Sequence, residues 1–172
     1  MSSVLIVRKP TNLEQHQSLG LGSENDQYHD SRYFAFMQKT HKEHYACLDA
    51  LTQHLKKLKH DYQDVLAGDE KPKEHFDFVI ALGGDGTLIT SSYYISDQTP
   101  LIGIRSSSAS VGFLCTGDIH SLATILDKQD RGELAFIERS RLNAHVLRRD
   151  GTSESSKFPA LNDLLFAATS PS

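Results

Sequence analysis

The sequence contains little cysteine, since only Cys47 and Cys115 occur among its 172 residues. Two cysteines are too few for a disulfide framework, and the spacing between them matches no metal-binding motif. The first residues also lack the pattern of a signal peptide, because the apolar run at residues 4–7 is too short. We therefore expect a reducing, cytoplasmic compartment.

Basic charge and long apolar runs are also scarce. The chain has 18 Lys and Arg against 22 Asp and Glu, and its formal net charge is −4. This mild acidity argues against nucleic acid and against a membrane surface as partners. No apolar run approaches the roughly 20 residues that a membrane-spanning helix needs. With 38% hydrophobic and 23% charged residues, the composition is that of a folded chain of one domain or slightly more.

Strand and helix patterns alternate up to about residue 130. Short apolar runs predict strands at residues 4–7, 76–82 and 100–104, with 65–66 as a candidate short strand. Helical patterns occupy residues 33–60, 88–95 and 118–127, and the polar stretches 11–32, 61–74 and 105–110 are predicted connections. This alternation is typical of an α/β fold, so we expect a Rossmann-like parallel sheet forming a nucleotide-binding domain over residues 1–130.

The predicted long helix has an apolar stripe. Leu48, Leu51, Leu55, Leu58 and Tyr62 recur at spacings of three and four residues. Such a stripe favours a helix docked on a sheet, and the alternative is a helix that binds a partner in a groove. After residue 131 the pattern changes to strand-like runs at 134–138, 142–147 and 164–168, with a loop at 148–156. Consecutive strands indicate an antiparallel sheet, so residues 131–172 are predicted to begin a β-rich second domain.

The segment Gly83-Gly84-Asp85-Gly86-Thr87 directly follows the clearest predicted strand. Ligands of open α/β sheets bind at the carboxyl ends of strands. Glycines let the backbone approach a ligand closely, and their N–H groups can then face an anion. A carboxylate repels phosphate, so Asp85 indicates a chemical task, which is either removing a proton from an attacking hydroxyl or holding Mg²⁺. The structural alternative is a turn that happens to be rich in glycine.

The rest of the sequence gives little evidence of a further site. Neither a G-x-x-x-x-G-K-[ST] loop nor a G-x-G-x-x-G loop after a strand is present. His41 and His44 are spaced i, i+3 on the predicted helix, but no further ligands are placed by spacing, so we predict no metal site there. Two roles are predicted for Arg105, either a bidentate contact to a phosphate or a surface salt bridge. The serines that follow it are read as a flexible linker rather than as ligands.

The glycine segment resembles the signature loop of the NAD kinases, which diacylglycerol and sphingosine kinases share and phosphofructokinases carry as a variant. The flanking sequences favour the first of these. Residues 100–104 and 111–114 resemble the "P-hydrophobic-hydrophobic-G-V-N … G-F-L" pattern of NAD kinases, and residues 160–163 resemble the "A-L-N-E" motif, with Asp163 in place of Glu. The "P-x-G-T-x-N-D" stretch expected of a lipid kinase is absent.

The resemblance implies a function and a set of site residues. The reaction would phosphorylate the 2′-hydroxyl of the adenosine ribose of NAD with ATP and Mg²⁺ or another divalent cation, giving NADP. The implied general base is Asp85. The implied nucleotide-binding residues are Gly83, Gly84, Gly86, Thr87, Phe113, Asn162 and Asp163.

Some alternatives remain open beside this resemblance. They are a kinase of the same superfamily that acts on a lipid or another alcohol, and a nucleotide-binding fragment without catalysis. The family continues its β-rich domain with a "T-G-S-T-A-Y"-like motif, which this sequence lacks, so we expect an incomplete second domain. The expected partners are small nucleotides, and the resemblance implies a homo-oligomer for the full-length protein.

Overall fold

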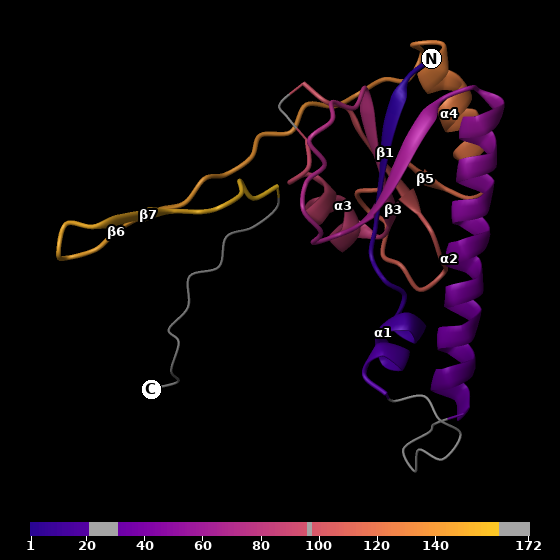
Figure 1. Ribbon diagram of the computed structural model, residues 1–172, viewed down its shortest axis with the longest axis horizontal. Helices are drawn as coiled ribbons and strands as arrows, with labels where there is room; N and C mark the ends of the chain where they lie inside the picture. The colour runs from indigo at the N-terminus through magenta and orange to yellow at the C-terminus, as the bar shows by residue number, and fades with distance from the viewer. Residues whose placement is uncertain (21–30, 96–97, 162–172) are drawn as a thin grey trace. The chain divides into compact units, whose positions relative to one another are not determined.

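The computed structural model describes residues 1–20, 31–95 and 98–161 (Figure 1). Contacts divide the chain into two units, Met1–Ala135 and Phe136–Ser172. We describe each unit by itself.

The first unit is built on a five-stranded parallel sheet. Its strands are β1 (Ser3–Arg8), β2 (Asp61–Leu66), β3 (Phe78–Gly83), β4 (Leu101–Arg105) and β5 (Gly117–Asp118). They lie in the order β2-β1-β3-β4-β5, and every neighbouring pair is parallel. The predicted α/β class with a parallel sheet is therefore confirmed.

Helices cover both faces of this sheet (Figure 1). They are α1 (Asn12–Ser18), α2 (Ser31–Lys57), α3 (Asp85–Ser91) and α4 (Leu122–Asp130). The long α2 and the shorter α4 pack on one face and contact each other, while α3 packs on the other face against β3 and β4. None of the described helices combines the length and the apolar character needed to cross a membrane.

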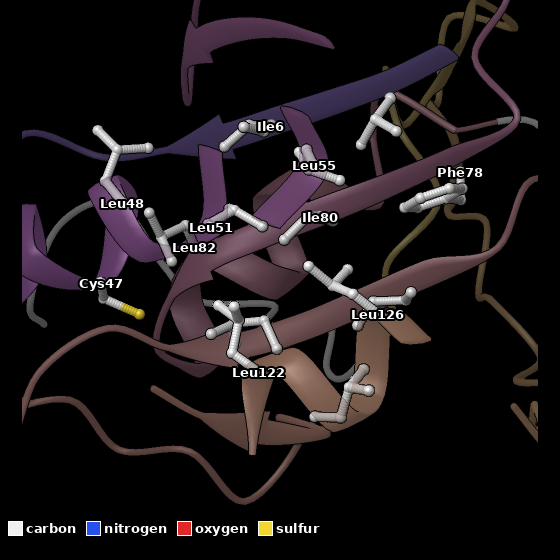
Figure 2. Packing of buried hydrophobic residues seen from close by; sticks show 14 residues of the cluster. Ile6, Cys47, Leu48, Leu51, Leu55, Phe78, Ile80, Leu82, Leu122 and Leu126 are labelled. Carbon is white, nitrogen blue, oxygen red and sulfur yellow. The ribbon is translucent and has the colours of Figure 1, made fainter. Parts of the chain in front are cut away.

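The larger part of the core lies between the sheet and the helices α2 and α4. Figure 2 shows Leu48, Leu51 and Leu55 of α2 directed at the strands β1 and β3. Leu122 and Leu126 of α4 extend the same cluster. Full burial of one such leucine contributes roughly 1.5–3 kcal/mol to folding. The predicted docking of the apolar stripe on a sheet is thus confirmed, although Tyr62 belongs to β2 rather than to the helix.

Alternation along the strands explains the second, smaller core. Val4 and Ile6 of β1 face the cluster under α2, whereas Leu5 and Val7 point to the opposite face of the sheet. On that face α3 approaches β4 closely, since a Cβ added at Gly103 would lie 2.5 Å from Leu88 Cδ1. Both faces of the central strands are therefore buried, which accounts for their unbroken apolar sequences.

The predicted boundaries need correction at several places. Residues 11–32 were expected to be a connection, but residues 12–18 form α1. Thr11 caps this helix, because its Oγ1 accepts from the Glu14 N–H at 3.3 Å while Glu14 Oε2 accepts from the Thr11 N–H at 2.7 Å. This Thr-x-x-Glu capping box is readable from the sequence. Strand β2 is also longer than the candidate strand at 65–66, since an edge strand needs only a few apolar residues.

The second unit contains one antiparallel pair in its described part, β6 (His145–Leu147) and β7 (Ser153–Ser155). The loop predicted at 148–156 is wrong at its end, because β7 lies within it. Gly151 adopts a φ of 83°, and this left-handed conformation turns the chain between the two strands. The strand predicted at 134–138 does not form, and these residues are largely exposed. The run at 164–168 lies outside the described residues.

Candidate functional site

The glycine loop (residues 83–87) lies where the strand order of the sheet reverses. Strand β3 ends at Gly83 and α3 begins at Asp85, with Gly84 in an extended conformation between them. The neighbouring strand β1 ends at Arg8 and leads toward the helices of the opposite face. Because the chain leaves β1 and β3 toward different faces, a crevice opens between their carboxyl ends, as is typical of ligand sites in doubly wound sheets.

A cavity of about 290 Å³ occupies this position. Four segments line it: residues 9–12 after β1, residues 83–86 of the glycine loop, residues 106–107 and 109–111 after β4, and the α2 side chains Thr40 and His44. The volume lies at the lower end of the range for small-molecule sites, which is roughly 300–1,000 Å³. The sheet and α2 together thus form a concave site around the motif that the sequence singles out.

The three glycines of the loop differ in why a side chain is missing at each position. A Cβ at Gly83 would lie 2.2 Å from Thr87 Oγ1, and one at Gly84 would lie 2.6 Å from the Val111 carbonyl oxygen. These two glycines are required by the packing of the protein itself. A Cβ at Gly86 would meet nothing within 4 Å. Since Gly86 lines the cavity and its neighbours leave room for a side chain, its missing Cβ leaves space for a ligand.

This difference yields a prediction for two single substitutions. Gly83→Ala should destabilise the fold by about 1–3 kcal/mol, because the new methyl group overlaps Thr87. Gly86→Ala should keep or slightly raise stability, by up to about 1 kcal/mol from helix propensity, yet weaken binding of ATP, the nucleotide that the sequence resemblance implies for this cavity. Urea unfolding followed by circular dichroism and calorimetric titration with ATP measure the two effects. Unchanged ATP affinity in Gly86→Ala would show that no ligand approaches this position.

The side chain of Asp85 is held at the edge of the cavity. Its Oδ1 accepts from the Leu114 N–H at 2.8 Å, and its Oδ2 accepts from the Phe113 N–H at 3.2 Å. Its own N–H donates to the Val111 carbonyl at 2.9 Å. The carboxylate is half-buried and borders the cavity. Each oxygen retains further lone-pair sites, so this fixed carboxylate is able to accept a proton from a hydroxyl group placed in the cavity.

Two of the other site residues predicted from the sequence, Thr87 and Phe113, do not line the cavity. Thr87 is 1% exposed, and its Oγ1 is buried against Gly83, without a hydrogen-bond partner in the described parts of the chain. Thr87 therefore lies behind the cavity wall rather than in it. Phe113 is 92% exposed and does not line the cavity. Asn162 and Asp163 lie outside the described residues.

Residues 106–110 form the serine loop, most of which lines the cavity, and side chains of α2 contact this loop. Glu43 Oε2 accepts from both the N–H and the Oγ of Ser108, at 2.7 and 2.8 Å. These two hydrogen bonds, the backbone one first, lower the pKa of Glu43 below its usual value. Ser106 Oγ lies 2.8 Å from His44 Nδ1. Adjacent residues of α2 thus fasten the loop at two points.

Arg105 forms the surface salt bridge that was one of its two predicted roles, since its Nη2 lies 3.2 Å from Asp118 Oδ2. Sequence reasoning missed Lys9 and His44 as cavity residues. A basic residue directly after the first predicted strand was the available signal for Lys9. His44 had no local signal, because only the packing of α2 on the sheet brings it to the cavity.

A comparison with known protein families gives a match that includes most of the cavity residues. A model of the ATP-NAD kinase N-terminal domain matches residues 11–134. The chain belongs to this family. The matched residues include the glycine loop, the serine loop and all of α2, which together supply most of the cavity wall. The resemblance inferred from the glycine loop and its flanking residues 100–104 and 111–114 is thereby confirmed, and the motif at residues 160–163 lies outside the match.

Individual relatives agree with the family assignment. A protein from Chlorobium phaeobacteroides (strain BS1) named NAD kinase is 36% identical over 96 residues, which are 56% of this chain and 32% of the relative. An NAD kinase from Clostridium beijerinckii is 32% identical over 101 residues, which are 58% of this chain and 34% of the relative. The matched part thus spans about a third of the length of these curated relatives.

Proposed function

We propose that the protein acts as an ATP-dependent NAD kinase, which phosphorylates the 2′-hydroxyl of the adenosine ribose of NAD. One observation carries the proposal: in a chain of the ATP-NAD kinase N-terminal domain family, the Asp85 carboxylate is fixed at the edge of the cavity that the glycine loop lines. A ribose hydroxyl attacks phosphorus only as its proton leaves, and a positioned carboxylate accepts that proton.

The proposed step is the transfer of the γ-phosphoryl group of ATP to the ribose hydroxyl. The ribose oxygen forms a bond to the γ-phosphorus of ATP, the bond from that phosphorus to the β,γ-bridging oxygen breaks, and the hydroxyl proton moves to Asp85. The products are ADP and NADP. The protein contributes mainly position and charge, which is the usual division in phosphoryl transfer. Gly86 leaves room for a phosphate group next to Asp85, and the N–H groups of residues 113 and 114 orient the carboxylate.

A divalent cation fits this arrangement. Mg²⁺ is usually held by one or two carboxylates together with phosphates of the substrate. Asp85 is the one carboxylate among the described residues that line the cavity, and because it serves as the base, the donor phosphates would hold the ion, with water completing its coordination. When bound, the ion would neutralise charge that develops on the transferred phosphoryl group.

The test is a product assay. The protein is incubated with NAD, ATP and Mg²⁺, and NADP is separated and quantified by chromatography. Parallel reactions replace NAD with diacylglycerol or sphingosine, which separates the proposal from a lipid kinase of the same superfamily. NADP formation from NAD and no lipid phosphorylation is the expected result. Lipid phosphorylation without NADP formation would overturn the proposal.

A second candidate is a nucleotide-binding module without catalysis. It is supported by the length of the match, which spans about a third of the relatives named NAD kinase. Calorimetric binding of NAD and ATP without any turnover would favour this candidate. Cytoplasmic location and homo-oligomerisation stay predictions, to be measured by cell fractionation and by sedimentation.

A further inference from the structure

His44 is an unusual residue in the cavity wall. It lies on α2, one turn after Thr40, and both side chains line the cavity. Its side chain is almost fully buried, since the residue is only 4% exposed. The ring nitrogen Nδ1 has a partner, Ser106 Oγ, at 2.8 Å. The other nitrogen, Nε2, is buried and makes no hydrogen bond to any residue that the structure describes.

A buried ring nitrogen without a hydrogen-bond partner is unusual. Buried polar groups are nearly always hydrogen-bonded, and leaving one without a partner lowers stability. Burial, reinforced by the positive charge of Arg8, lowers the pKa of His44 to about 4, so the ring is neutral at physiological pH. When Nδ1 accepts the Ser106 hydroxyl proton, the neutral ring carries its own proton on Nε2. His44 then carries an unpartnered N–H donor on the buried ring of a residue that lines the cavity.

Other residues that line the cavity also carry hydrogen-bond donors, which suit a ligand with many acceptor atoms. Lys9 follows β1 directly and lines the cavity, so it adds a positively charged residue to this wall. It forms no ion pair within residues 1–20, 31–95 and 98–161. Ser107 and Ser110 also line the cavity, and their Oγ atoms lie 3.2 Å apart. Among the residues that the structure describes, Asp85 is the only carboxylate that lines the cavity, so this side of it suits a ligand with several anionic oxygens.

We propose that Lys9, His44, Ser107 and Ser110 form a subsite for the polyphosphate of the phosphoryl donor, in which His44 donates from Nε2 to a phosphate oxygen. The subsite lies in the same cavity as the glycine loop, and it rests on the proposed function. It adds to that function a named histidine and a named lysine that hold the donor. The glycine loop approaches the phosphates through its backbone, whereas these residues hold them through side chains.

The competing interpretation gives His44 a purely structural role, in which it fastens the serine loop to α2. The neighbouring residue Glu43 provides the matched control, because it fastens the same loop through Ser108 without lining the cavity. His44→Asn separates the two roles. The asparagine amide takes the place of Nδ1 and keeps a partner for Ser106, but it has no group at the position of Nε2.

The test is calorimetric titration of the wild-type chain and its variants with inorganic tripolyphosphate and with ATP, each with Mg²⁺. We expect His44→Asn to weaken tripolyphosphate binding about tenfold, as does the loss of one hydrogen bond to a charged group. Lys9→Met should cause a loss of similar size and reduce the salt dependence of binding. Glu43→Gln should stay within about twofold of the wild type.

A spectroscopic readout distinguishes contact from loop support. In ¹⁵N spectra, His44 of the free protein should be the tautomer protonated on Nε2. Tripolyphosphate should raise the pKa of His44 above its free value of about 4, because a nearby anion favours the protonated ring. A histidine that only holds the serine loop would keep the same pKa with and without tripolyphosphate, and this result would overturn the proposal.

The outcomes also separate this proposal from the proposed function. Equal tripolyphosphate affinity in wild type and His44→Asn would overturn the subsite even if the protein forms NADP. Binding of adenosine as tight as that of ATP, with no binding of tripolyphosphate, would likewise overturn it. Tripolyphosphate binding that depends on His44, in a protein that forms no NADP, would support the subsite and count against the proposed function.

Discussion

Asp85→Asn is expected to reduce the rate of NADP formation at least about 10²-fold. The amide has nearly the same size as the carboxylate, but it is far too weak a base to accept the proton of a ribose hydroxyl. One of its atoms still accepts an N–H from residues 113–114, so most of the loop contact should remain. Steady-state kinetics with NAD and ATP measure the effect, and we expect it in kcat more than in the KM for NAD.

Asp118→Asn is the matched control for this substitution. Asp118 lies at the end of β5, at the same edge of the sheet, but it pairs with Arg105 and does not line the cavity. We expect its kinetics to stay within a few-fold of the wild type. Equal rates in wild type and Asp85→Asn would remove Asp85 from the chemistry.

Lowering the pH from about 7 to about 5 should cost roughly 2 kcal/mol of folding stability through His44 alone. Burial first, and then the charge of Arg8, depress the pKa of this residue from 6.5 to about 4 in the folded protein. The unfolded chain therefore takes up a proton as the pH falls below about 6.5, while the folded chain does not. The stabilising effect is fully present above the unfolded pKa and is lost progressively down to the folded pKa. Urea unfolding monitored by circular dichroism across this range measures it.

His44→Asn serves as the reference for the pH series. The variant has no titrating ring at position 44, so its stability should fall less steeply between about pH 7 and about pH 5, whatever its absolute value. Other groups that titrate in this range contribute equally to both proteins and cancel in the difference. Parallel pH profiles for wild type and variant would contradict the neutral, buried state of His44.

Much of the first unit was predictable because its signals are local. The apolar runs at β1, β3 and β4 and the leucine stripe of α2 have the periods of strands and of a docked helix. What the sequence pattern missed has weak or competing signals. The edge strand β2 has a largely polar sequence, so only its last two residues were a candidate strand, and β5 has only two residues. The capping box at Thr11 was a readable signal that the polar composition of residues 11–32 obscured.

The site was predictable to a smaller extent. The glycine loop and Asp85 form one continuous motif, and a strand followed by this motif places them at the edge of a sheet. Lys9, His44 and the serine loop come from three separate segments, and only the packing of α2 over the sheet brings them together. Thr87 is the reverse case, since the motif implies a nucleotide contact for it and it does not line the cavity. Its place in the motif indicated a ligand contact, yet the close packing of α3 on Gly83 buries its hydroxyl.

The central claim is that the cavity between the carboxyl ends of β1 and β3 binds the phosphoryl donor. A 19.2 kDa chain suits amide NMR, so titration of the labelled protein with ATP and Mg²⁺ tests this claim most directly. We expect the largest shifts at residues 83–86 and 106–111 and small shifts on the far side of α4. Saturable shifts confined to other parts of the chain, or none at millimolar ATP, would contradict it.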